Sequence, residues 1–382
     1  MDGSLMSEQQ HDWHETVKRT ASKLCRAVGV IGAGSYGTAL AIHCARAGHP
    51  TVIWCRSQEV ADEINTQHTN SRRLPGHSCP KQLSATTDLE GMVRASMLLL
   101  LAVPSAHIAA TAQRCVEHLL PEAVLVCCAK GITTETLQTM EELLLEVVPR
   151  PQHCQLAYLS GPSFAAEVAA GMPTGLTIAA REESVAKQVQ WWLSAANLRC
   201  YRTTDVVGLE FGGALKNVIA IACGMADGKG YGANGRAMII TRGLHEMTRL
   251  AVAKGANPMT LGGLGGMGDL ILTCTGDASR NRTLGYRLGQ GESMASILAG
   301  MHGAVAEGVS TTRAAKLLAD RLGLQVPIIS GLYKILYEDA DIDDVVRSLL
   351  CLPLTSELDS RMFSYEPYRD SSSTQQQQQA SS

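Results

Sequence analysis

A glycine-rich segment, GAGSYGTALA at residues 32–41, limits what this chain can fold into more than any other stretch. It follows the apolar run 26–31 and opens a helical pattern over 35–47 that Gly48 ends. Its glycines have the spacing G-x-G-x-x-G, at Gly32, Gly34 and Gly37. Between a strand and a helix, this spacing permits a tight turn, and the helix N-terminus offers N–H groups to a pyrophosphate. The segment favours a dinucleotide-binding unit over an idle glycine turn.

Further apolar runs in the first half of the chain are typical of buried strands. Several are continuous rather than alternating, as expected of parallel strands covered on both faces. Amphipathic segments such as 135–148 separate some of them, and this one is expected to be a helix. The repeated order of strand, helix and strand predicts a doubly wound, mostly parallel α/β sheet. We expect its later strands at 51–56, 97–103, 123–129, 155–159 and 174–180.

The pattern changes near residue 205, where strand-like runs give way to long helical patterns. The sequence therefore predicts a Rossmann-type domain over 26–205 and an all-helical substrate and catalytic domain over 206–368. Residues 1–25 form an N-terminal extension. The glutamine-rich stretch 369–382 is of low complexity and is expected to be disordered.

Composition narrows the class of protein. The formal net charge of −3 argues against nucleic-acid binding by bulk charge, so an anionic substrate needs a few local basic groups. The 12 cysteines form no C-x-x-C pair and no Cys/His cluster at metal spacing, which favours a reduced, intracellular protein without a metal site. We find no apolar run long enough for a membrane span and no signal peptide, so the expected location is cytoplasmic.

The end of the second predicted strand bears on the choice of cofactor. An NAD site usually has an acidic residue there for the ribose diol. Here the strand ends in Trp54, Cys55 and Arg56. Arg56 has the chemistry to meet a 2′-phosphate or to stack on adenine, and the alternative is a solvated loop residue. It favours tolerance of NADP without excluding NAD.

Two lysines are candidates for chemistry. Lys216 and Asn217 are the only strongly polar residues of 214–226, an apolar helical stretch. Burial of an unpaired ammonium lowers its pKa, which makes a lysine a usable acid and base near neutral pH. A lysine that snorkels to the surface is the alternative. Lys130 ends a predicted strand, where the ligand crevice of an open α/β sheet lies, although a solvated loop lysine fits equally well.

Three more segments carry candidate binding groups. The turn SGPSF offers backbone N–H groups and the Ser163 hydroxyl. In GGLGGMGDLILTC, Asp269 either caps a helix or orients Lys216, with Thr273 one turn later on the same face. The segment 277–282 places Ser279, Arg280 and Asn281 at the start of another helix. An arginine beside free N–H groups suits a phosphate, and a surface arginine is the alternative.

Taken in order, blocks of this sequence resemble the signature blocks of NAD(P)-dependent glycerol-3-phosphate dehydrogenases. The GALKN and GDLxxTC…SRN blocks are far more specific than the glycine pattern. The resemblance implies reversible hydride transfer between NAD(P)H and dihydroxyacetone phosphate, giving sn-glycerol 3-phosphate, in a homodimer paired through the helical domain. The blocks are GAGSYG, AVPS, CCAKGI, SGPSFAAEV, FGGALKNVIAI, GLGGMGDLILTC, SRNRTLG and VAEGV.

The resemblance also implies roles for individual residues. Lys216 is similar to the family's proton donor and acceptor, assisted by Lys130 and Asp269. The cofactor contacts expected from the glycine loop and the strand end are Gly32, Gly34, Ser35, Tyr36, Gly37 and Arg56, and the Arg56 position varies within the family. The resemblance adds Lys130, Ala165, Arg280, Val305 and Glu307. The expected substrate contacts are Lys130, Gly161, Ser163, Lys216, Asp269, Thr273, Ser279, Arg280 and Asn281.

Two other functions use the same architecture. A reductase of 2-hydroxy or 3-hydroxy acids needs its own anion anchor, and SRNR after GDLxxTC favours a phosphate instead. A dinucleotide sensor without catalysis keeps the glycine loop but has no need for Lys130, Lys216 and Asp269 together. The chain's ends match nothing in the family pattern.

Overall fold

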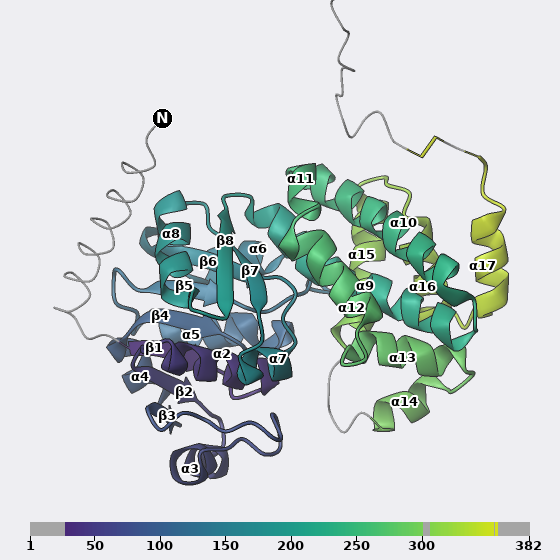
Figure 1. Ribbon diagram of the computed structural model, residues 1–382. Helices are drawn as coiled ribbons and strands as arrows, with labels where there is room; N and C mark the ends of the chain where they lie inside the picture. The colour runs from purple at the N-terminus through teal and green to yellow at the C-terminus, as the bar shows by residue number, and fades with distance from the viewer. Residues whose placement is uncertain (1–26, 301–305, 355, 358–382) are drawn as a thin grey trace, which may run out of the picture.

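The computed structural model of the chain describes residues 27–300, 306–354, 356 and 357 (Figure 1). Its first half is an eight-stranded sheet in the order β3-β2-β1-β4-β5-β6-β7-β8. Neighbouring strands are parallel except β6 and β7, which are antiparallel. The doubly wound, mostly parallel sheet is thus confirmed. The strands are β1 (Ala27–Ile31), β2 (Thr51–Trp54), β3 (Leu83–Thr86), β4 (Ser96–Leu101), β5 (Val124–Cys127), β6 (Leu156–Ser160), β7 (Thr174–Ala179) and β8 (Leu198–Thr203).

Helices cover both faces of this sheet, which explains the continuous apolar runs. Along β4, Leu98 and Leu100 belong to one core cluster, whereas Leu99 and Leu101 belong to another. The first cluster contains residues of α2 (Ser35–Arg46), α3 (Gln58–Gln67), α7 (Ala165–Ala170) and α8 (Glu183–Leu193). The second contains residues of α4 (Leu89–Ala95), α5 (Ile108–Val116) and α6 (Met140–Val147).

The described residues after β8 are helical, around the central helix α9 (Val206–Gly228). Its crossing with α13 is very close: a Cβ at Gly285 would lie 2.0 Å from the Ile221 carbonyl oxygen. The other helices are α10 (Gly232–Ala253), α11 (Pro258–Leu261), α12 (Asp269–Thr275), α13 (Arg280–Gly289), α14 (Met294–Gly300), α15 (Glu307–Arg321), α16 (Pro327–Tyr337) and α17 (Ile342–Leu350).

Among the described residues, α9 is the one helix long and apolar enough to cross a membrane, and 83% of its apolar window is buried inside the protein. This burial is typical of a core helix, so the prediction that the chain has no membrane span stands for the described residues. The apolar character of α9 serves the core of the helical part, where it packs against α10, α12, α13 and α15.

Some local expectations also differ from the structure. The helix expected over 135–148 begins only at Met140, because Thr139 and Glu142 form a capping box there and Leu137 has a positive φ of 60°. The 3₁₀-helical segments η1 (Ser105–His107) and η2 (Arg150–Gln155) were not predicted. The eleven cysteines of the described segments are free, and no group of His, Cys, Asp or Glu there could hold a metal ion.

Candidate active site

The glycines of the loop are packed closely against neighbouring backbone, except at Gly34. Gly32 has a φ of +114°, and a Cβ there would lie 2.8 Å from the Ala102 carbonyl oxygen. A Cβ at Gly37 would lie 2.0 Å from the Gly32 carbonyl oxygen, whereas one at Gly34 would meet nothing within 4 Å. The loop is therefore tightly packed on one side and open at Gly34.

Helix α2 presents its N-terminus at this open side. Gly34 is its N-cap and supplies no capping side chain, and the first turn carries no acid. Its first N–H groups and the positive end of the helix dipole are thus available to an anion. These residues fit the pyrophosphate of a dinucleotide.

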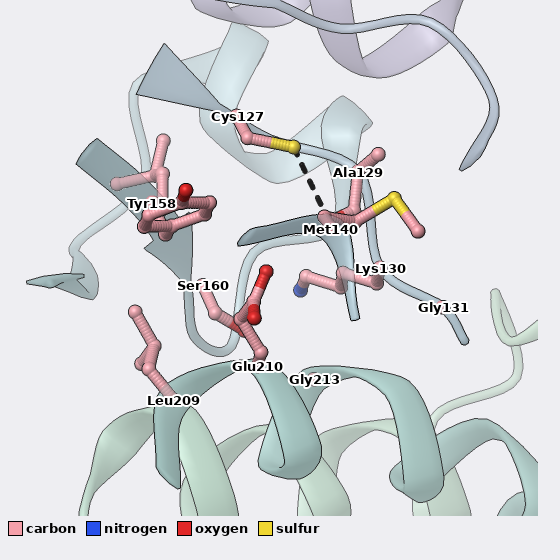
Figure 2. Close-up of a pocket in the computed structure, with 11 residues that line it drawn as sticks. Cys127, Ala129, Lys130, Gly131, Met140, Tyr158, Ser160, Leu209, Glu210 and Gly213 are labelled. Carbon is pink, nitrogen blue, oxygen red and sulfur yellow. Dashed lines mark hydrogen bonds between the residues drawn. The ribbon is translucent and has the colours of Figure 1, made fainter. Parts of the chain in front are cut away.

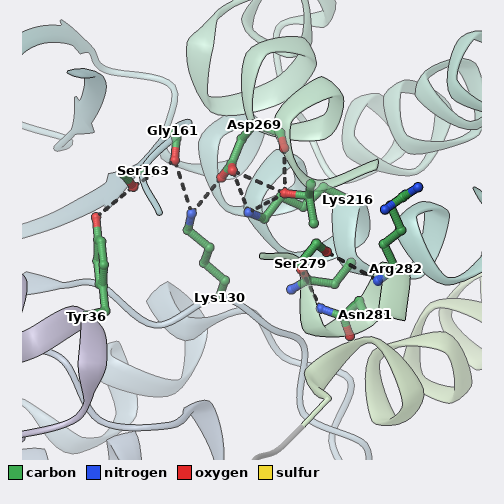
Figure 3. Close-up of polar contacts among 11 residues, drawn as sticks. Tyr36, Lys130, Gly161, Ser163, Lys216, Asp269, Ser279, Asn281 and Arg282 are labelled. Atoms are coloured by element: carbon green, nitrogen blue, oxygen red, sulfur yellow. Dashed lines mark hydrogen bonds and ion pairs between the residues drawn. The ribbon is translucent and has the colours of Figure 1, made fainter. Parts of the chain in front are cut away.

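The other predicted cofactor contacts differ in their hydrogen bonds and in their exposure. Ser35 Oγ donates to the Arg73 carbonyl oxygen at 2.6 Å, which leaves its backbone N–H for a ligand. The Tyr36 hydroxyl lies 3.1 Å from Ser163 Oγ, so Tyr36 reaches from α2 to the turn after β6 (Figure 3). Arg56 is exposed directly after β2, and Ala165 is the first residue of α7.

Lys216 and Lys130 share one carboxylate, that of Asp269 (Figure 3). Lys216 Nζ donates to Asp269 Oδ1 at 2.5 Å, and Lys130 Nζ donates to Asp269 Oδ2 at 2.6 Å. Lys216 Nζ also donates to Thr273 Oγ1 at 3.0 Å, and Thr273 in turn donates to the Asp269 carbonyl oxygen at 2.6 Å. Lys130 makes a further, longer bond of 3.4 Å to the Gly161 carbonyl oxygen.

A π-helical turn over Leu264–Gly268 brings Asp269 to this position. The turn packs closely on α9, since a Cβ at Gly212 would lie 2.5 Å from the Gly265 carbonyl oxygen. Asp269 is then the first residue of α12 and is only 1% exposed. Of the two interpretations of this acid, the structure shows the one in which it pairs with Lys216.

Burial and charge together set the protonation of this cluster. Burial lowers the pKa of Lys216 to about 8, and Lys130 acts in the same direction, while the Asp269 carboxylate opposes them. Burial alone would favour protonated Asp269, but the two ammonium groups hold the pKa of this carboxyl below its ordinary value. The cluster therefore contains an ionised acid and a lysine that titrates near neutral pH.

The residues predicted to bind a phosphate lie at the start of helix α13. Ser279 caps it, since its Oγ accepts a hydrogen bond from the Arg282 N–H at 3.2 Å. Arg282 is committed to Asp227 and Asp277 through ion pairs, whereas Arg280 is exposed at the first helical position. Arg280 is therefore the arginine of this block that can reach a ligand.

Two further predicted contacts, Asn281 and Glu307, lie near the starts of α13 and α15. Asn281 Nδ2 donates to Asn217 Oδ1 at 3.0 Å, and Asn281 Oδ1 accepts from the Gly308 N–H at 3.0 Å. This side chain ties α9, α13 and α15 together, and one of its two amide N–H donors is already used. Burial raises the pKa of Glu307, against the positive charges of Arg280 and Lys130. Val305 lies outside the described residues.

Sequence reasoning missed two residues close to this cluster. Asn217 holds Asn281 in place, and its position beside Lys216 was the one available signal. Glu210 lies on α9 with its Oε2 atom buried, and it lines a small pocket together with Lys130. An acid within an apolar helix was the signal for Glu210.

Comparisons with known proteins agree over almost the whole described chain. The family model described as NAD-dependent glycerol-3-phosphate dehydrogenase N-terminus matches residues 27–186, and the corresponding C-terminus model matches residues 205–347. A glycerol-3-phosphate dehydrogenase (NAD(P)+) of Leptospira biflexa is 48% identical over 330 residues, which are 86% of this chain and 99% of that protein.

Among solved structures, the chain is also similar to glycerol-3-phosphate dehydrogenases. The glycerol-3-phosphate dehydrogenase of Coxiella burnetii superposes with a TM-score of 0.79 at 34% identity, covering 85% of this chain and 99% of that one. A ketopantoate reductase of Ralstonia eutropha, with a TM-score of 0.52 at 17% identity, covers 81% of this chain and 97% of that one. The second similarity extends to the fold alone.

Proposed function

This chain belongs to the NAD-dependent glycerol-3-phosphate dehydrogenase family, and we propose that it interconverts dihydroxyacetone phosphate and sn-glycerol 3-phosphate with Lys216 as the general acid and base. The balanced reaction is dihydroxyacetone phosphate plus NAD(P)H plus H⁺ giving sn-glycerol 3-phosphate plus NAD(P)⁺. The observation that supports this most is the buried Lys216 ammonium, whose pKa is lowered to about 8 and which is held by Asp269 and Thr273. A dinucleotide sensor has no use for such a group.

Several residues would hold the cofactor. The turn from Gly32 to Gly37 and the N-terminus of α2 would bind its pyrophosphate. Arg56 follows the strand whose end distinguishes NAD from NADP in this fold, and its positive charge is compatible with a 2′-phosphate. When bound, the nicotinamide supplies the hydride for C2 of the substrate or accepts it.

Lys216 moves the proton. In the reducing direction its Nζ donates a proton to the C2 oxygen as negative charge develops there, and in the other direction it takes the hydroxyl proton back. A pKa of about 8 suits both steps, because a group that titrates near the working pH donates and accepts with little penalty. Asp269 and Thr273 fix the position of Nζ.

Lys130 and Arg280 supply the positive charge that a chain of net charge −3 otherwise lacks at this site. Lys130, held against Asp269, would stabilise the developing charge on the substrate oxygen, an effect that is often the largest contribution of a protein to catalysis. Arg280 and the first N–H groups of α13 would hold the substrate phosphate. Gly161 and Ser163 would line the same site.

The family resemblance further supports a homodimer paired through the helical part and a cytoplasmic location. Light scattering of the purified protein tests the dimer, because a monomer at micromolar concentration contradicts it. Imaging of the tagged full-length chain tests the location, and accumulation in an organelle contradicts it.

The first test is an assay of purified protein with dihydroxyacetone phosphate, NADH and NADPH being supplied in parallel. Loss of reduced-nicotinamide absorbance with either nucleotide supports the proposal, and the ratio of the rates shows what Arg56 does. A 2-oxo acid such as pyruvate is the matched control substrate. Oxidation with pyruvate alone favours the hydroxy-acid reductase, and nucleotide binding without oxidation favours the sensor.

A further inference from the structure

A small pocket lies beside Lys130, where the start of α9 packs against the ends of β5 and β6 (Figure 2). Its volume is about 10 Å³, which is room for the centre of about one water molecule. Three oxygen-bearing side chains reach it, those of Glu210, Ser160 and Tyr158. None of these residues belongs to the set that the reaction above uses.

One oxygen of each of these side chains is buried and unpaired. Glu210 Oε2, Ser160 Oγ and Tyr158 OH have no hydrogen-bond partner among the residues that the structure describes. An unpaired buried polar atom is costly, so three at one pocket call for a ligand. A buried water molecule typically makes about three such bonds.

The protonation of Glu210 suits this arrangement. Its other oxygen, Oε1, accepts a hydrogen bond from the Glu141 N–H at 2.8 Å. Burial raises the pKa of Glu210 to about 8, against the Thr139 hydroxyl and the Glu141 N–H, which lower it. At neutral pH Glu210 is thus mostly a neutral acid, whose Oε2 can donate a hydrogen bond into the pocket.

The remaining charged groups around Glu210 are already engaged. Glu141 is paired with Arg181, and Glu142 with Lys254, and both acids raise the pKa of Glu210. Burial also raises the pKa of Tyr158 well above its ordinary value, so its hydroxyl stays neutral. Lys130 is the cation that shares the pocket with Glu210.

The pocket touches Lys130 directly. A Cβ at Gly213 would lie 2.7 Å from Ser160 Oγ and 3.4 Å from Lys130 Cγ, so the hydroxyl and the lysine stem meet at one point of α9. Figure 2 shows the Lys130 ammonium and the Glu210 carboxyl pointing toward one another. An ammonium has three N–H donors. Two of those of Lys130 reach Asp269 and Gly161, which leaves one for a further acceptor.

We propose that this pocket is a binding site for one internal water molecule held by Glu210, Ser160 and Tyr158, and that through it Glu210 is a positioning residue for Lys130. The water would give the Lys130 ammonium a third hydrogen-bond partner besides Asp269 and Gly161. The kinetic part of this inference rests on the proposed function, whereas the water site itself does not.

The first experiment removes the two hydroxyls separately, with Tyr158→Phe and Ser160→Ala in the full chain. Each change deletes one oxygen without adding bulk. If the water is bound, each variant loses a hydrogen bond and its Tm falls by about 2 °C. If the pocket is dry, each variant loses an unpaired polar atom, its Tm stays or rises, and the inference is overturned. Tyr201→Phe, at a tyrosine that is 49% exposed, is the matched control.

The second experiment separates positioning from packing. Glu210→Gln keeps the bonds to Glu141 and to the water, whereas Glu210→Met keeps only the volume. We expect the KM for dihydroxyacetone phosphate to stay unchanged in the first variant at pH 7 and to rise about tenfold in the second, with a smaller change in kcat. Equal KM values in both variants overturn the positioning role. Thermal unfolding and NADH binding verify that each variant folds.

The pH profile gives an independent readout. Above pH 8 the wild-type Glu210 ionises and places a negative charge beside Lys130, so the KM for the anionic substrate should rise. Glu210→Gln cannot ionise and should lack this rise, while Glu117→Gln at an exposed site keeps it. Identical profiles in wild type and Glu210→Gln contradict the role. If no variant acts on dihydroxyacetone phosphate, the proposed function fails, and the Tm comparison alone still decides the water site.

Discussion

Replacement of Asp269 by asparagine tests the centre of the proposed mechanism. The change keeps the size of the side chain but removes the negative charge that Lys216 and Lys130 share. In the wild type, burial and Lys130 lower the pKa of Lys216, and Asp269 alone among these three effects raises it. Without that charge, the pKa of Lys216 must fall below its wild-type value of about 8. A smaller fraction of Lys216 then carries a proton to donate at pH 7.

General values for acid catalysis and for buried ion pairs give the size of this effect. A positioned acid typically contributes about 10²- to 10⁴-fold to a rate, so we expect dihydroxyacetone phosphate reduction to fall by at least about 100-fold at pH 7. Removal of one partner from a buried ion pair costs roughly 3–5 kcal/mol of folding stability. The loss here should lie below that range, because Lys216 can escape the penalty by losing its proton.

The assay is the pH dependence of kcat/KM for dihydroxyacetone phosphate reduction. Reduction needs protonated Lys216, so the wild-type rate should fall above pH 8, and in Asp269→Asn this fall should move to lower pH. Asp277→Asn is the matched control, since the Asp277 side chain is 98% exposed and pairs only at the surface with Arg282. A variant at Asp269 with the wild-type profile and rate would refute the reasoning.

Four further substitutions separate the roles of the site. Lys216→Ala should lose turnover by at least about 1,000-fold while NADH still binds by fluorescence, and normal turnover rules out the proton-transfer role. Arg280→Ala should raise the KM for dihydroxyacetone phosphate by roughly tenfold or more with a smaller change in kcat, and an unchanged KM excludes Arg280 as the phosphate anchor. Gly34→Ala meets nothing within 4 Å, so it should fold normally and weaken NADH binding, whereas Gly37→Ala meets a carbonyl oxygen at 2.0 Å and should lower the Tm. Unimpaired NADH binding by Gly34→Ala would contradict the placement of the pyrophosphate.

The central strands could be predicted from the sequence because they are apolar on both faces. β4 and β5 carry continuous runs for this reason, since consecutive residues enter different cores. β3 and β8 are edge strands with partly exposed residues, so neither forms such a run, and neither was predicted. The sequence therefore predicted the fold class and the central strands but not the two edge strands, β3 and β8.

The site was predictable where one residue carries the signal by itself. Lys216 stands out in an apolar helix, and Asp269 follows a run of glycines, but only the folded chain decides between capping and pairing for this acid. Asn281 was expected near the phosphate, and its side chain also bonds to Asn217 and to the Gly308 N–H, which no local pattern records. The pocket beside Lys130 depends on residues of separate elements, so only tertiary packing defines it.

The shared carboxylate also links the two lysines of the site. Lys130 comes from the end of β5 in the sheet, whereas Lys216 and Asp269 come from the helical part, so Asp269 joins both halves of the molecule through one buried group. The approach of the helical part to the sheet is then linked to the proton affinity of Lys216. When Lys130 is near, the Asp269 carboxylate pairs with two ammonium groups instead of one. The positive charge of Lys130 also lowers the pKa of Lys216 directly. Separation of the two halves would return the whole carboxylate to Lys216 and raise its pKa, which makes it a weaker acid. In the proposed mechanism, contact between the sheet and the helical part therefore favours proton donation by Lys216.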